Sequence, residues 1–144
     1  MKFWTAIVLG LTGLQVALAA DQAKPFSCKY NDDDGEATRL YKRVESNASD
    51  WYSRYKAIQF CKRANGQGSY VLIEEELIHG FKVLNPARAI LSSKAEPEGV
   101  TSYHIADDID QVVLQVSADE SLMNALGSWN EKKYSAKLKL VWSK

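Results

Sequence analysis

A strict alternation of apolar and polar side chains marks the C-terminal end of the chain. The apolar set is Tyr134, Ala136, Leu138, Leu140 and Trp142, and the polar set between them is Ser135, Lys137 and Lys139. A period of two residues is that of a β-strand with one buried and one solvated face. Exposed lysines are typical of an edge strand, where charge prevents pairing with other chains. The fold must therefore contain a β-sheet, and we expect 134–142 at its edge.

The centre of the chain holds further strand patterns. Residues 65–68 (NGQG) have the composition of a turn. The strand candidates that follow it are 70–73, 77–84, 89–91, 100–105 and 111–117. Gly80 suggests a bulge in the second of them. A short strand is also expected at 26–30.

Three segments show helical spacing instead. In 36–44 the apolar residues fall at i, i+3, i+4 and i+7, in 49–61 they recur every three or four residues, and 119–129 suits a short helix. These apolar sets are Ala37, Leu40, Tyr41 and Val44; Trp51, Tyr55, Ile58 and Cys61; and Leu122, Met123 and Leu126. Helices followed by strands predict an α+β fold, a small helical cover packed on an antiparallel sheet. An all-β fold such as a sandwich is the alternative if 49–61 is extended.

The N-terminus has the three parts of a secretion signal. Lys2 precedes an apolar stretch at 3–18, and Ala17-Leu18-Ala19 is an A-x-A cleavage site. The stretch is interrupted by polar residues and is shorter than the ~20 apolar residues that span a bilayer. We expect a signal peptide at 1–19 and one secreted domain at 20–144, without membrane association after cleavage. An N-terminal membrane anchor is the alternative.

The chain has two cysteines, Cys28 and Cys61. An even count in a secreted protein indicates a disulfide, and a loop of this size stabilises the fold by roughly 3–4 kcal/mol. A free thiol or a metal pair is the alternative reading, but neither cysteine has a C-x-x-C partner or a nearby histidine. We predict a structural Cys28–Cys61 bridge.

The charge balance bears on the partners. Without Lys2, the 18 basic residues of the chain become 17 against 18 acidic residues, a net charge of −1. A domain that binds nucleic acid electrostatically is normally basic. The near-neutral balance therefore argues against an electrostatically driven nucleic-acid binder, and we expect a monomer.

One group of residue types could support catalysis. RNA cleavage by 2′-hydroxyl attack needs a general base, a general acid and a cation near the phosphate. The candidates are Glu75, His79, Arg88 and His104. With 25% charged residues such a group arises easily by chance, and glutamates at a solvated strand end with ordinary surface histidines are the better explanation. We therefore expect a protein that is not an enzyme.

Signatures of bound groups are missing from the sequence. His79 and His104 do not have the spacing of a zinc site, the acidic run 32–34 does not have the spacing of a calcium loop, and there is no glycine-rich phosphate loop. We expect neither a metal nor a cofactor. Asn47-Ala48-Ser49 is an N-glycosylation sequon, and Ser49 could instead serve as a helix cap.

The tripeptide Phe26-Ser27-Cys28 is an aromatic-x-Cys motif close to the expected mature N-terminus. With the signal peptide and the small helix-plus-sheet domain, the chain resembles the ribonuclease-like secreted effectors of powdery mildew fungi. The resemblance implies a catalytically inactive relative of guanyl-specific fungal ribonucleases, with a helix packed on a bent antiparallel sheet. Such effectors act inside plant cells and are sometimes recognised by immune receptors. Here no histidine follows His104, and Cys61 lies far from the C-terminus where the family places the partner cysteine.

The functional prediction combines these observations. We expect a secreted effector that acts without catalysis and binds a host protein or RNA to modulate host immunity, outside or inside host cells. The alternatives are an active secreted ribonuclease and an apoplastic inhibitor or glycan-binding module.

Overall fold

The computed structural model describes residues 24–46, 52–77, 82–106, 111–129 and 131–144. The regular elements of these segments are β1 Lys29–Tyr30, β2 Asp33–Asp34, β3 Glu36–Ser46, β4 Tyr52–Lys62, β5 Ser69–Leu77, β6 Lys82–Leu84, β7 Arg88–Ala95, the 3-10 turn η1 Pro97–Gly99, β8 Thr101–Ile105, β9 Gln111–Val116, β10 Leu122–Trp129 and β11 Lys132–Ser143. The predicted signal peptide at 1–19, Asn47, His79 and Gly80 lie outside the described residues. Among the described residues no helix is long and apolar enough to cross a membrane.

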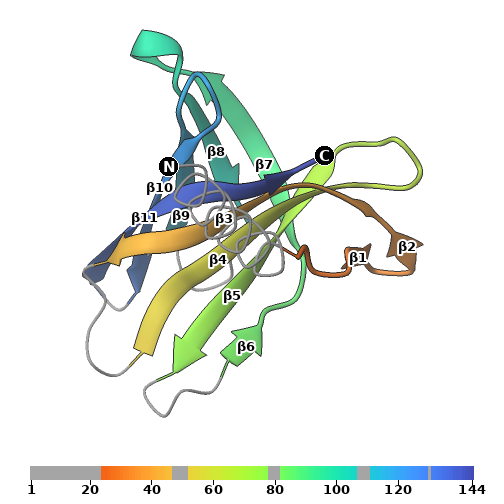
Figure 1. Ribbon diagram of the computed structural model, residues 1–144, viewed down its shortest axis with the longest axis horizontal. Helices are drawn as coiled ribbons and strands as arrows, with labels where there is room; N and C mark the ends of the chain where they lie inside the picture. The colour runs from red at the N-terminus through yellow and green to blue at the C-terminus, as the bar shows by residue number, and fades with distance from the viewer. Residues whose placement is uncertain (1–23, 47–51, 78–81, 107–110, 130) are drawn as a thin grey trace, which may run out of the picture.

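The long strands form a closed antiparallel barrel (Figure 1). Following the wall, the order is β3, β4, β5, β7, β8, β9, β10 and β11, and β11 pairs again with β3. Apart from the closing pair, each strand lies beside its neighbour in sequence, an up-and-down arrangement. The short β6 pairs with the far end of β5.

The predicted α+β fold is wrong. The segments 36–44, 49–61 and 119–129, expected to be helical, contribute to β3, β4 and β10, and the described residues show no α-helix. The helix-on-sheet arrangement implied by the ribonuclease-like resemblance is therefore absent from the described part of the chain. The all-β alternative fits, with one sheet closed on itself rather than two stacked sheets.

Burial on both faces explains why β3 and β4 imitate helical spacing. The side chains of Leu40 and Tyr41 are adjacent in sequence and both fully buried, and in β4 every residue of 57–61 is buried. Tyr41, Ile58 and Phe60 belong to the barrel core, whereas Cys61 belongs to a second core outside the wall. A strand covered on both sides loses the period of two that marks a half-solvated strand.

The barrel interior is filled by side chains. Its core draws on every long strand: Tyr41, Tyr55, Ile58, Phe60, Val71, Ile73, Ile105, Val112, Leu114, Val116, Met123, Ala125, Tyr134, Ala136 and Leu138 are buried, and Ile90 of β7 packs against them. A barrel of this strand number is just wide enough for such filling. The expected inward face of β11 is thus confirmed for Tyr134, Ala136 and Leu138. Its expected place at an edge is wrong, because β11 pairs with β10 and β3.

The N-terminal segment 26–35, which precedes β3, crosses the outside of the wall, and we call it the strap. The predicted disulfide is confirmed: Cys28 and Cys61 are bonded, with their Cα atoms 6.0 Å apart. The backbone N–H of Phe26 donates to Oε1 of buried Gln59 (2.7 Å), and Nε2 of Gln59 donates to the Phe26 carbonyl (2.8 Å). Phe26, Tyr30 and the disulfide cover outward side chains of β4 and β5. The outer face of β4 is therefore buried by the chain itself.

Candidate functional site

The residues predicted for catalysis lie on different sides of the barrel wall. Arg88 pairs with Val71, a core residue, so it belongs to the inner face of β7. His104 pairs with Val113 between the inward residues of β8 and β9, and it is exposed on the outer face. Glu75 is four residues from Val71 along β5, a separation of roughly 13 Å. The structure does not bring Arg88 and His104 together, and His79 lies outside the described residues.

The described segments contain no candidate metal site. No group of three or more histidine, cysteine, aspartate or glutamate side chains that could hold a metal ion occurs among them.

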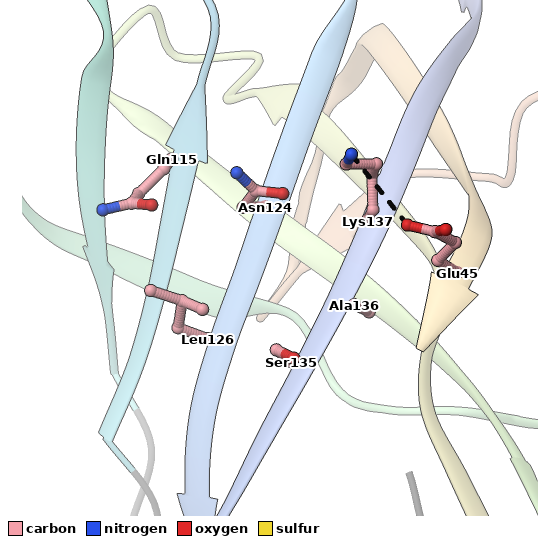
Figure 2. Close-up of a pocket in the computed structure, with 7 residues that line it drawn as sticks. All are labelled: Glu45, Gln115, Asn124, Leu126, Ser135, Ala136 and Lys137. Carbon is pink, nitrogen blue, oxygen red and sulfur yellow. Dashed lines mark ion pairs between the residues drawn. The ribbon is translucent and has the colours of Figure 1, made fainter. Parts of the chain in front are cut away.

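A shallow hollow of about 540 Å³ lies on the outer face of β9, β10, β11 and β3 (Figure 2). We call it the outer hollow; its polar and aliphatic lining includes Glu45, Gln115, Asn124, Leu126, Ser135 and Lys137. These residues alternate along their strands with core residues such as Leu114, Ala125 and Leu138. Their side chains thus point away from the core.

Strand register aligns four of these residues in one row. Gln115 pairs with Asn124, Asn124 with Lys137, and Lys137 with Glu45. Figure 2 shows the row running across four neighbouring strands, with the Lys137–Glu45 ion pair at one end. The Nζ of Lys137 is 3.9 Å from Oε2 of Glu45, and both side chains are at least half exposed. This ion pair contributes little to stability because water screens it.

The side-chain amides of Gln115 and Asn124 have donors and acceptors that are available to a ligand. Within the described part of the chain, the side chains of Gln115 and Asn124 form no hydrogen bond with another protein group. Each primary amide offers two donors and an acceptor. Leu126 in the next row and Leu122, two residues away along β10, are 38% and 44% exposed. The outer hollow therefore presents two adjacent amides that lack hydrogen-bond partners among the described residues, with exposed leucines beside them on β10.

A second polar cluster surrounds Arg39, whose guanidinium lies over an aromatic ring of the barrel core. Its Cζ lies 4.3 Å from the centre of the Phe60 ring, and Nη1 donates to the Tyr41 hydroxyl (3.3 Å) and lies 3.6 Å from Glu120 Oε2. The Tyr41 hydroxyl donates to the Glu120 carbonyl at 2.7 Å. Burial raises the pKa of Tyr41, and the nearby positive charge of Arg39, which lowers that pKa, offsets the effect only in part. For Arg39, burial alone would lower the pKa, but Tyr41, Tyr103 and Glu120 together raise it. These contacts hold the charged Arg39 against the core, so the cluster has a structural role.

Sequence reasoning missed the outer hollow for a definable reason. The alternation in 111–117 and 134–142 already places Gln115 and Lys137 opposite the core-facing residues. Asn124 was assigned to a helix, and the register that joins it to both neighbours is set by three separate strands. The polar residues between core positions were the available signal.

Comparison of the chain with models of protein families, with curated proteins and with solved structures gives no match.

Proposed function

We propose that this chain is a secreted effector that acts without catalysis by binding a host protein through the outer hollow. The observation that carries the proposal is the row of unpaired amides flanked by exposed leucines. A filled barrel core leaves recognition to the outer surface, and the strap already covers part of that surface. The A-x-A site and the disulfide are consistent with a secreted protein.

A protein partner fits the outer hollow better than RNA does. Lys137 is the cation in its lining, and that lysine is already paired with Glu45. The described lining contains no aromatic side chain on which a base could stack. RNA binding draws most of its affinity from cations that neutralise phosphates. Amides and leucines instead suit hydrogen bonding and apolar contact with a protein surface.

Photo-crosslinking followed by a direct titration tests the proposal. A photo-reactive residue at position 126 should capture a defined protein from plant leaf extract, and the purified form of that protein should then bind the wild type in a calorimeter. Leu126→Arg should weaken this binding roughly tenfold or more, because it places an unpaired charge in the contact. Leu91→Arg is the matched control, since Leu91 is a 68% exposed leucine of β7 outside the hollow. Equal binding by Leu126→Arg, or binding of glycans or RNA alone, would rule the proposal out.

The absence of ribonuclease activity is a separate prediction. Cleavage needs a base, an acid and a cation within hydrogen-bond reach of one phosphate. Arg88 and His104 lie on opposite faces of the wall, so we expect no turnover of a short guanosine-containing RNA. The assay compares the wild type with a His79→Ala, His104→Ala double variant. Steady cleavage by the wild type, lost in the double variant, would show that the protein is an enzyme.

A further inference from the structure

The barrel wall parts between β5 and β7. These strands pair at two positions, Tyr70 with Ala89 and Val71 with Arg88. Beyond this point β7 continues with β8 as its partner, whereas β5 leads back into its hairpin with β4. In Figure 1 the β7–β8 hairpin and the β4–β5 hairpin extend in different directions from this point. The wall is therefore open between the two hairpins.

A cleft of about 390 Å³ occupies this opening, and we call it the mouth cleft. One wall is the β4–β5 hairpin, with Arg63, Gln67 and Ser69, and the other is formed by Ile90, Ser93 and Tyr103 of β7 and β8. The volume lies within the range of small-molecule sites, and the mouths of β-barrels are a common place for them. The lining combines one cation, several neutral hydrogen-bonding groups, an aromatic ring and an aliphatic side chain.

Arg63 is fixed in place without a neutralising partner. Its Cζ lies 4.1 Å from the centre of the Tyr30 ring in the strap, and Tyr30 in turn contacts Tyr70 with a ring separation of 5.1 Å. The Nε–H of Arg63 is buried and has no hydrogen-bond partner in the described structure. No described carboxylate lies within ion-pairing distance of Arg63. A positioned guanidinium of this kind is suited to bind a planar anion.

The opposite wall determines the rest of the ligand. The Tyr103 ring packs edge-on against Phe60, with the ring centres 5.2 Å apart, and Ile90 packs against the same core. The Tyr103 ring and Ile90 thus form an apolar part of this wall that is anchored to the core. Arg39, behind it, has its charge engaged with Glu120. A single available cation favours a ligand with one negative charge.

We propose that the mouth cleft binds a small molecule that carries one carboxylate on an aromatic or aliphatic body. The carboxylate pairs with Arg63 and accepts hydrogen bonds from Ser69 or Ser93, and the body packs on Tyr103 and Ile90. This site is separate from the outer hollow, so either proposal can fail without the other.

Calorimetric titration with 2-naphthoate tests the charge requirement, with neutral 2-naphthamide as the matched probe. Wild type should bind the acid, and the amide should bind roughly tenfold or more weakly, because it lacks the charge that pairs with Arg63. Arg63→Gln should remove this preference. Lys62→Gln is the control, since it deletes an equal charge from the neighbouring, exposed residue, and it should bind as wild type does.

A second measurement uses the wild type alone, so it tests the proposal even if Arg63→Gln fails to fold. Backbone amide NMR of the wild type with 2-naphthoate should shift the signals of Ser69, Ser93 and Tyr103 and leave those of Asn124 and Lys137 unchanged. Equal affinity for acid and amide would overturn the proposal, as would shifts that avoid the mouth cleft or no binding up to roughly 10 mM.

Discussion

Two tyrosines pass close to glycines, one in the barrel wall and one in the strap, at places that have no room for a side chain. A Cβ atom on Gly127 would overlap the hydroxyl group of Tyr55, and one on Gly35 would overlap that of Tyr70. Both tyrosine side chains are fully buried. Tyr55 also has a φ of 58°, which is uncommon for a residue with a bulky side chain. The packing at each site therefore depends on the absent Cβ.

Gly127→Ala should destabilise the protein by about 1–3 kcal/mol, the usual cost of overpacking a filled core. Urea unfolding followed by circular dichroism measures the change. Adding Tyr55→Phe should recover part of the loss, because it removes the hydroxyl that the new methyl group meets and the two sites are coupled. A Gly127→Ala variant with the same urea midpoint as the wild type would show that the wall accommodates a methyl group at this position.

Asp119 in the β9–β10 turn should titrate well below an ordinary aspartate. Its Oδ1 accepts hydrogen bonds from the Ser121 hydroxyl (2.7 Å), the Ser121 N–H (3.0 Å) and the Ser117 hydroxyl (2.8 Å). Led by the Ser121 hydroxyl, these bonds lower the pKa of Asp119 from 3.8 to about 2. NMR titration of the side-chain carboxyl should find that value. A midpoint near 4 would contradict the geometry.

The same shift makes a prediction for stability. Because the pKa in the folded state is depressed, the contribution of Asp119 is complete above its unfolded pKa and is lost as the pH falls from about 4 towards 2. Asp119→Asn removes this contribution. The variant should therefore lose less stability than wild type across this pH window, as measured by thermal unfolding. Identical losses would show that the turn does not depend on the carboxylate.

At the scale of elements, the strap and the outer face of β4 stabilise each other. The disulfide fixes Cys28 to Cys61, and Gln59, fully buried, satisfies both backbone groups of Phe26. An amide in this position is favourable because each buried polar group has a partner. Arg63 then stacks on Tyr30 of the strap. The strap thus connects the disulfide to the wall of the mouth cleft.

Replacing Cys28 and Cys61 by alanine should cost about 2–5 kcal/mol in the free energy of unfolding. The bridge closes a loop with a sequence separation of 33 residues, and its loss releases the strap as well. Denaturant unfolding of oxidised, reduced and substituted protein measures the effect. A loss below ~1 kcal/mol would mean that the hydrogen bonds of Gln59 hold the strap without the bridge. Two free thiols in the non-reduced protein would disprove the bridge itself.

At the scale of the whole molecule, β11 completes the ring. It pairs along one side with β10 and along the other with β3, which joins the two ends of the described domain. Closure leaves β3 and β11 without free edges, so neither of these two strands offers a template for pairing with other chains. Lys137 and Lys139 of β11 face outward as a solvated surface rather than as protection for an edge.

A chain truncated at Ser135 should therefore fail to fold. The deletion removes the buried Leu138 and Ala136 and exposes the pairing edges of β3 and β10. Each large buried side chain contributes roughly 1.5–3 kcal/mol, so the loss is a large fraction of a typical total stability. A chain lacking Lys144 alone is the control and should fold. Native near-ultraviolet circular dichroism from the truncated protein would show that the barrel tolerates an open wall.

The sequence by itself determined the strands whose burial is one-sided. The segments that became β9 and β11 alternate because one face meets the core and the other meets water, so their period of two can be read directly. The Cys28–Cys61 bridge was also determined, since two cysteines allow a single intramolecular pairing. The inward positions of Leu114 and Leu138 follow from the same alternation.

The tertiary structure alone decided the rest. β4 carries consecutive buried residues because the core covers one face and the strap covers the other, and no local pattern records a cover supplied from elsewhere in the chain. β10 places Met123 inward and leaves Leu122 and Leu126 exposed, which local spacing could not distinguish from a helix. The outer hollow and the mouth cleft depend on register and on where two strands part. Both are properties of pairing between distant segments. No local sequence pattern records such pairing, so only the tertiary structure determines where the two sites lie.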